Sequence, residues 1–183
     1  MRRTVNNAIS VLFTTVKFFC MKLGNIAGFH FSLPERFSPN VVTEFNRGST
    51  VRLGRGIRVH SGSKIKVRKG AMLRIEENVR INYNCFIVCH QEIQIGEGTE
   101  FGPSVYLYDH DHDFRVGLKA NQFRTGPIKI GKNCWIGANT VILRGTEIGD
   151  NCVVGAGSVI KGKYPNNAVI FQNRETTVRE YCS

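Results

Sequence analysis

The sequence predicts an all-β fold, a parallel β-solenoid with a helical segment in front of it. Nineteen glycines among 183 residues indicate many tight turns rather than long helices. From residue 130 onward a branched aliphatic residue recurs at every sixth position, and the fifth position of each block is small. A hydrophobic content of 42% is typical of one globular unit.

The first segment, residues 1–49, is expected to be a helix followed by a connection. Within NAISVLFTTVKFFCMKLG the apolar residues recur at the spacing of one helical face, at Ile9, Leu12, Phe13, Val16, Phe19 and Cys20. The run is short and Lys17 interrupts it, which disfavours a transmembrane span. We expect this helix to pack on the body of the protein or on a neighbouring subunit; attachment to a membrane surface is a less favoured alternative.

The second segment, residues 50–170, is expected to be the solenoid. Its clearest part reads IGKNCW IGANTV ILRGTE IGDNCV VGAGSV, with Ile130, Ile136, Ile142, Ile148, Val154 and Ile160 in the leading positions. An aliphatic residue every sixth position cannot stay on one helical face, but it can point inward once per side of a coil of short strands. The glycines that follow most of these residues suit the corners, and each coil buries its face against its neighbours.

One interruption divides the repeat. Leu107 and Ile130 both hold leading positions, yet the stretch of chain between them is not a whole number of six-residue blocks. A loop over residues 108–127 is therefore expected to leave the coil, and it contains the run DHDHD with His110 and His112. These side chains could ligate zinc or nickel, decorate a solvated turn, or move a proton.

Composition narrows the classes of partner. A net charge of +11 fits a solvated basic face, a phosphate-bearing ligand or an anionic membrane surface. No nucleic-acid partner is expected, because no helix-turn-helix or RNA-binding signature accompanies the charge. The six cysteines are scattered without a C-x-x-C pair, and no signal-peptide cleavage pattern stands near residue 1. We therefore expect a cytoplasmic protein with no metal site.

Four stretches are similar to a known family: INYNC, IGEGTEFGPSVYLYDHDHDF, PIKIGKNCWIGANTVI and IGDNCVVGAGSVI. They resemble the left-handed β-helix hexapeptide acyltransferases, in particular the galactoside, maltose, nodulation-factor and capsular-polysaccharide O-acetyltransferases, and the resemblance covers about Arg52 to Arg179. It implies a left-handed coil, a homotrimer, acetyl-CoA as acyl donor and a sugar hydroxyl as acceptor. Surface-polysaccharide or glycoconjugate assembly is the expected setting.

The resemblance also implies one catalytic histidine on the loop. Matching the family segment G-P-N-V-x-[IL] to GPSVYL and counting on without a gap places it at His112; His110 is the alternative, or a support for the loop. A neutral imidazole can take the proton of a sugar hydroxyl as that hydroxyl attacks a thioester. Asp109, Asp111 or Asp113 could hold the ring in the required tautomer.

Further residues are implied to bind substrate. Asn82 matches an asparagine that hydrogen-bonds the acceptor sugar, and Tyr83 could lie against that sugar. The alternative is that Asn82 and Asn84 are corner residues, because asparagine tolerates left-handed backbone. Trp135 matches a tryptophan near the catalytic cleft and is assigned to cofactor binding, with ordinary packing as its alternative.

The cofactor groove is implied to contain Ala138, Ala156 and Lys161, with Arg179 near the nucleotide phosphates. The backbone amide at Ala138 is also implied to stabilise the oxyanion of the tetrahedral intermediate. The tail, residues 171–183, departs from the family. It reads FQNRETTVREY where relatives carry G-[NV]-P-[AC]-[KR], and Arg174 could replace the missing basic residue.

Two other functions are compatible with the sequence. One is N-acyl transfer to an amino sugar or an antibiotic, by a related hexapeptide enzyme. The other is a non-catalytic solenoid scaffold, in which the loop histidines have no chemical role. Binding of CoA and release of its thiol would separate an enzyme from a scaffold.

Overall fold

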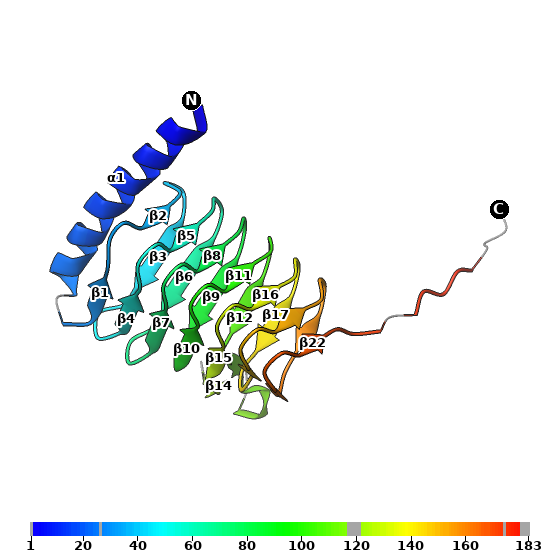
Figure 1. Cartoon of the computed structure of the whole chain (residues 1–183). Helices are drawn as coiled ribbons and strands as arrows, with labels where there is room; N and C mark the ends of the chain where they lie inside the picture. Colours follow the sequence, from blue (N-terminus) through cyan, green and yellow to red (C-terminus); the bar gives the residue numbers. More distant parts are fainter. Residues whose placement is uncertain (1, 26, 117–121, 174, 180–183) are drawn as a thin grey trace, which may run out of the picture.

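The computed structural model describes residues 2–25, 27–116, 122–173 and 175–179. The chain forms a left-handed parallel β-helix of six complete coils and a partial seventh, with one helix across its first coil (Figure 1). Each complete coil contributes one strand to each of three parallel sheets, here named A, B and C. The fold class is therefore as predicted.

The elements have the following bounds. The helix is α1 (Arg2–Gly24). Sheet A contains β1 (Phe29–Phe31), β4 (Thr50–Leu53), β7 (Met72–Ile75), β10 (Glu92–Ile95), β15 (Ile128–Ile130), β18 (Glu147–Ile148) and β21 (Lys163–Tyr164). Sheet B contains β2 (Arg36–Phe37), β5 (Arg58–Val59), β8 (Arg80–Ile81), β11 (Glu100–Phe101), β16 (Trp135–Ile136), β19 (Val153–Val154) and β22 (Val169–Ile170). Sheet C contains β3 (Val42–Phe45), β6 (Lys64–Val67), β9 (Phe86–Cys89), β12 (Tyr106–Tyr108), β17 (Val141–Leu143) and β20 (Val159–Ile160). Outside the coils lie β13 (His110–His112), the 3₁₀ turn η1 (Phe114–Val116) and β14 (Phe123–Thr125).

The six-residue register places the core. Every predicted leading position is buried: Ile130, Ile136, Ile142, Ile148, Val154 and Ile160. The small fifth positions are buried as well: Cys134, Thr140, Thr146, Cys152 and Ser158. Alternate residues of each strand point to opposite faces, so these side chains fill one continuous core along the axis of the solenoid.

In the corner at residues 137–139, glycine allows close stacking and asparagine adopts the left-handed backbone. A Cβ on Gly137 would lie 2.5 Å from the backbone nitrogen of Ala156 in the next coil, so glycine is needed there for close stacking. The left-handed backbone lies elsewhere in the same corner, at Asn139 with φ 56°. This corner therefore turns through Asn139 and packs through Gly137, whereas the equivalent corner of the next coil turns through Gly157, with φ 71°.

The solenoid begins one coil before the predicted start at residue 50. The first coil is formed by β1, β2 and β3, which pair in parallel with β4, β5 and β6. In the later coils Ile130 stacks on Ile148 after three blocks of six. In the early coils Phe31 stacks on Leu53, and Leu53 on Ile75, over a longer stretch of chain. The six-residue period therefore does not reveal the early coils.

The helix α1 covers the first coil, but not with the face that the apolar spacing predicts. Thr14 and Phe18 are fully buried against the coil, and the Phe18 ring lies 4.9 Å from the ring of Phe37. The Oγ1 of Thr14 accepts the Phe37 N–H at 2.9 Å, and Lys17 Nζ donates to the Val41 carbonyl at 2.8 Å. The open end of a β-solenoid presents unpaired backbone groups, so the helix face that supplies polar partners is the one that packs.

The predicted apolar face of α1 is largely bare, although the edge of the Phe19 ring still packs on Phe31 of the first coil at a centroid distance of 5.5 Å. Ile9, Leu12, Phe13, Val16, Phe19 and Cys20 are all exposed. Among the residues that the structure describes, no helix is both long enough and apolar enough to cross a bilayer.

Candidate active site

The interruption in the repeat is a hairpin that leaves the solenoid between the fourth and fifth coils. Strands β13 and β14 pair antiparallel, with His110 opposite Thr125 and His112 opposite Phe123. The Gly126 N–H donates to the Asp109 carbonyl at 2.9 Å and closes the base of the hairpin. Residues 117–121 of the predicted loop lie outside the described residues.

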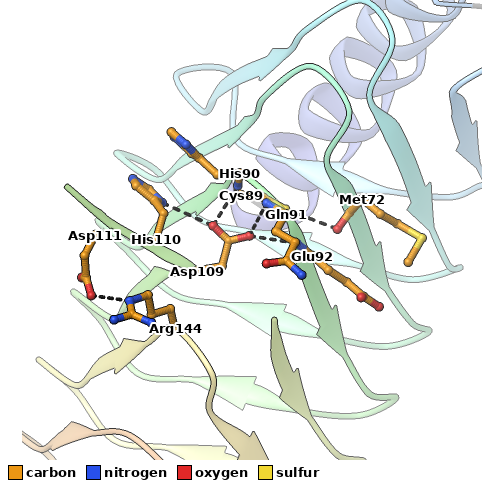
Figure 2. A network of polar contacts seen from close by, with 9 residues as sticks. All are labelled: Met72, Cys89, His90, Gln91, Glu92, Asp109, His110, Asp111 and Arg144. Carbon is orange, nitrogen blue, oxygen red and sulfur yellow. Dashed lines mark hydrogen bonds and ion pairs between the residues drawn. The ribbon is translucent and has the colours of Figure 1, made fainter. Parts of the chain in front are cut away.

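A buried carboxylate anchors the hairpin to the coil below. Asp109 is fully buried, and its two oxygens accept the backbone N–H groups of His90, Gln91 and Glu92 at 2.7–2.9 Å (Figure 2). These three amides form the corner between β9 and β10. Because one side chain satisfies three amides of that corner, it fixes the point at which the hairpin departs.

The same carboxylate remains charged despite its burial. Burial alone would raise the pKa of Asp109, but hydrogen bonds from His110 and from the three backbone amides outweigh that effect and lower the pKa. A fixed negative charge therefore lies beneath the histidines at neutral pH.

His110 is held by this charge and by stacking. Its Nδ1 lies 3.3 Å from the Asp109 carboxylate, so the Nδ1–H donates to that carboxylate. Its ring stacks on His90 at a centroid distance of 3.6 Å, and Phe123 packs against both rings. Burial, together with the neighbouring His110, lowers the pKa of His90 to about 4. His90 is therefore neutral at pH 7.

His112 lies farther out on the same strand. Its side chain is exposed, and its ring rests 4.7 Å from the ring of Phe123. The structure thus gives the two histidines different environments: His110 is tied down by Asp109 and His90, whereas the ring of His112 is open to an incoming molecule.

The other two loop aspartates pair with arginines. Asp111 accepts from Arg144, which follows β17 in the fifth coil, so this ion pair ties the hairpin to the coil above (Figure 2). Asp113 pairs with Arg115 inside the loop at 3.0 Å, and that hydrogen bond lowers the pKa of Asp113 to about 2. Of the three aspartates considered from the sequence, Asp109 is therefore the one in contact with an imidazole.

The predicted acceptor-binding and cofactor-binding residues gather mainly at a different corner. The hairpin emerges between sheets C and A, whereas Asn82 and Tyr83, Ala138, and Ala156 lie between sheets B and C in three different coils. Asn82 Oδ1 accepts the Tyr83 N–H at 2.9 Å, and the half-exposed Tyr83 ring packs on His60. The left-handed corner residue is Asn84, with φ 57°, so the corner interpretation applies to Asn84 and not to Asn82.

The remaining predicted residues are spread along the later coils. Trp135 projects from the outer face of sheet B, half exposed, between Glu100 and Val153 in the ladder. Lys161 is exposed at the corner between sheets C and A, and Arg179 is exposed in the tail. Arg174 lies outside the described residues. Within a single chain these residues and His112 do not form one continuous cluster.

Sequence reasoning missed two members of the loop support. His90 stands alone in the segment VCHQE, and Arg144 in ILRGT, so neither belongs to a recognisable motif. Both come into contact with the hairpin only through coil stacking. Among the described residues, no group of three His, Cys, Asp or Glu side chains is arranged to hold a metal ion.

Comparison with known proteins identifies the repeat. Residues 127–161 match the family model "Hexapeptide repeat of succinyl-transferase". The chain is 42% identical to nodulation protein L of Rhizobium leguminosarum bv. viciae over 37% of this chain and 36% of that protein. It is 38% identical to galactoside O-acetyltransferase of Escherichia coli over 50% of this chain and 46% of that protein.

A solved structure shows the same relation. The maltose O-acetyltransferase from Clostridium difficile matches with a TM-score of 0.52 and 36% identity, over 55% of this chain and 54% of that one. The chain thus spans less than two thirds of the length of the relatives that it matches. The repeat, the three-sided coil and these relatives make the chain similar to the hexapeptide-repeat acetyltransferases, and residues 127–161 carry the hexapeptide repeat itself.

Proposed function

We propose that this protein transfers an acetyl group from acetyl-CoA to a hydroxyl group of a sugar, with His112 as general base. The single observation that carries the proposal is the hairpin, which presents an open imidazole from a rigidly anchored strand on a hexapeptide solenoid. The identity to galactoside and maltose O-acetyltransferases supports the reaction class. A surface polysaccharide or glycoconjugate is the proposed acceptor class.

The proposed reaction has two steps: the hydroxyl oxygen attacks the thioester, and the CoA thiol then leaves. His112 takes the proton of the acceptor hydroxyl as its oxygen attacks the thioester carbonyl, and a tetrahedral oxyanion forms. The backbone amide of Ala138 is the proposed donor to that oxyanion. Collapse of the intermediate breaks the C–S bond, and the proton held by His112 passes to the departing CoA sulfur.

His110 has a positioning role in this proposal. Asp109 holds its Nδ1 and His90 covers its ring, so His110 keeps the strand that carries His112 in place. We expect His112→Ala to lower kcat by about 10²- to 10⁴-fold, the usual contribution of a general base. His110→Ala should lower kcat less and should also lower the melting temperature.

The complete site is proposed to form between copies of the chain in a homotrimer. His112 and the corner with Asn82 and Ala138 lie at different corners of the coil, so a neighbouring solenoid is needed to bring them together. Sheet C carries a suitable outer face, because Phe86, Tyr106 and other outward residues of its middle strands are apolar or aromatic and only partly covered.

Mixing two inactive variants tests this shared site. His112→Ala and Asn82→Ala would be unfolded together, refolded together, and assayed against each variant refolded alone. If each site uses residues of two copies, mixed trimers contain some intact sites and regain part of the activity. Light scattering should give a trimeric mass; an active monomer would refute the assembly.

The reaction itself is tested with a panel of acceptors. Purified protein is incubated with acetyl-CoA and galactosides, maltose, amino sugars or lipid-linked oligosaccharides, and products are read by mass spectrometry. An acetylated product that mild hydroxylamine cleaves is an ester and supports O-transfer, whereas a resistant product is an amide and favours the N-acyltransferase alternative. Absence of CoA binding would instead favour a scaffold.

A cytoplasmic location is part of the proposal. The cysteines Cys85, Cys89, Cys134 and Cys152 are free thiols buried in the solenoid. Free thiols are typical of a reducing compartment.

A further inference from the structure

The helix α1 leaves a large apolar face bare. Ile9, Leu12, Phe13, Val16, Phe19 and Leu23 have 40–76% of their surface exposed. Their spacing places them in one stripe along the helix, opposite Thr14 and Phe18, which face the solenoid. A contiguous exposed patch of large apolar side chains on a folded protein marks an interaction site.

The charge of the protein is concentrated at the same end. Residues 1–80 contain 15 Lys and Arg and 4 Asp and Glu, a net charge of +11 (15 − 4). Residues 81–183 contain 10 of each, a net charge of zero (10 − 10). The helix itself contains four basic residues and no acidic residue. The whole excess positive charge therefore belongs to the helix and the first coils.

The coils next to α1 stack these cations on the outer surface. Arg36, Arg58 and Arg80 follow one another in the ladder of sheet B, and Arg52 is followed by Arg74 in sheet A. Adjacent strands are about 4.8 Å apart, so the third coil lies roughly 10 Å from the first. In that third coil Arg74 and Arg80 pair with Glu76 and Glu100. The cations of the first two coils, Arg36, Arg52 and Arg58, lie within the Debye length of about 8–10 Å of the first coil, so their charges act at a surface touching the helix.

A groove beside the helix has matching chemistry. It is lined by Asn7, Ala8, Val11, Leu12, Thr15 and Arg36. Most of its wall is apolar, and the Arg36 guanidinium lies beside it. An acyl chain with an anionic headgroup fits such a groove, because the chain contacts the apolar residues while the headgroup meets the cation.

We propose that α1 docks this protein on the surface of an anionic lipid bilayer. The helix lies in the plane of the interface with its bare face among the acyl chains, and the arginines of the first coils meet the headgroups. Because α1 crosses the first coil, the solenoid extends from the membrane and the hairpin stands several coils away from it (Figure 1). The absence of acidic residues from α1 and the basic coils around it favour lipid over a second copy of this equally basic chain.

The test is vesicle flotation with the full chain. Vesicles of phosphatidylcholine alone and of phosphatidylcholine with phosphatidylglycerol are compared at low and at physiological salt. We expect binding that rises with the anionic lipid and weakens with salt. Val16→Asp should lower the bound fraction at least about tenfold, because it places a charge in the interface.

A matched control makes the same change at the other end. Val169 in β22 is 69% exposed, compared with 57% for Val16, so Val169→Asp changes net charge and exposed apolar area similarly. Val169→Asp should retain wild-type binding, and both variants should keep the wild-type melting temperature. The readout does not require acetyl transfer, so its outcome is independent of the proposed function.

Three results would overturn the proposal. The first is a wild-type protein that does not float with phosphatidylglycerol vesicles. The second is equal loss of binding in Val16→Asp and Val169→Asp. The third is a fall in oligomeric mass for Val16→Asp without any vesicle binding by the wild type, which would identify the bare face as an interface between copies of the chain.

Discussion

Asp109→Asn is the sharpest perturbation of the loop anchor. The Oδ1 of Asp109 accepts from the His90 N–H and the His110 Nδ1, and the Oδ2 accepts from the Gln91 and Glu92 N–H groups. An asparagine keeps the shape but offers one acceptor oxygen, and its amino group faces two donors. Two of the four contacts are therefore lost in either orientation of the amide.

The cost follows from the nature of these bonds. A hydrogen bond to a charged group contributes about 1.5–3 kcal/mol, so losing two should cost roughly 3–6 kcal/mol in the free energy of unfolding. At about 2–4 °C per kcal/mol for a chain of this length, the melting temperature should fall by roughly 6–24 °C. Activity should fall as well, because the strand that carries His112 is no longer anchored to the coil.

Asp111→Asn is the matched control. Asp111 makes one ion pair with Arg144 and its side chain is half exposed, so its loss should cost less than about 1 kcal/mol. Calorimetry of the two variants side by side is the assay. Equal melting temperatures would refute the claim that Asp109 holds the hairpin.

The pH dependence gives an independent check. The pKa of Asp109 is lowered in the folded protein, so its contribution is fully present above the unfolded value of about 3.9. It is lost as the pH falls through the lower, folded pKa. Asp109→Asn should therefore lack that part of the acid-induced loss of stability, and an unchanged acid transition would contradict the assignment.

Three further predictions concern the core, a buried acid and a corner. Val154→Asp should unfold the protein, because it buries a carboxylate at a cost of several kcal/mol, whereas Val153→Asp on the outer face should melt near wild type; denaturant titration compares them. Burial raises the pKa of Glu35 to about 9. The free energy of unfolding should therefore fall by up to about 3 kcal/mol as the pH rises from 4.5 to 7. Glu35→Gln should lack this fall and should be more stable than the wild type at pH 8. Gly137→Ala should lower the melting temperature because its Cβ would meet the Ala156 nitrogen at 2.5 Å, and an unchanged value would contradict the close stacking.

The sequence was sufficient to predict the register of the later coils. Ile130 and Ile148 stand three blocks of six apart in the chain and are adjacent in the ladder. The first coils escape this pattern because the chain from Phe31 to Leu53 is longer than three such blocks, with longer corners between the strands. Period alone therefore reveals a coil only where its corners are as short as the repeat requires.

The packing face of α1 could not be predicted from apolar spacing. Phe18 is the large apolar residue that enters the first coil, and it is accompanied by the polar Thr14 and by Lys17. Which face of α1 packs depends on the unpaired backbone groups of the first coil, and the sequence of the helix carries no information about those groups. The bare apolar stripe is the part that sequence reasoning identified, and the fold leaves it exposed.

The loop illustrates the same limit. Spacing located the hairpin and both of its histidines, but the contacts that distinguish His110 from His112 come from His90, Asp109 and Arg144, brought together by coil stacking. Such contacts depend on register between coils and not on local sequence.

His112 is proposed to act as the general base in acetyl transfer from acetyl-CoA to a sugar hydroxyl. The most direct measurement follows the CoA thiol and the acetylated sugar together for the wild type, His112→Ala and His110→Ala, each checked for fold. We predict equal amounts of thiol and sugar ester from the wild type, about 10²- to 10⁴-fold slower formation with His112→Ala, and a smaller loss with His110→Ala. Wild-type turnover by His112→Ala, or no sugar ester from the wild type across the acceptor panel, would contradict the account.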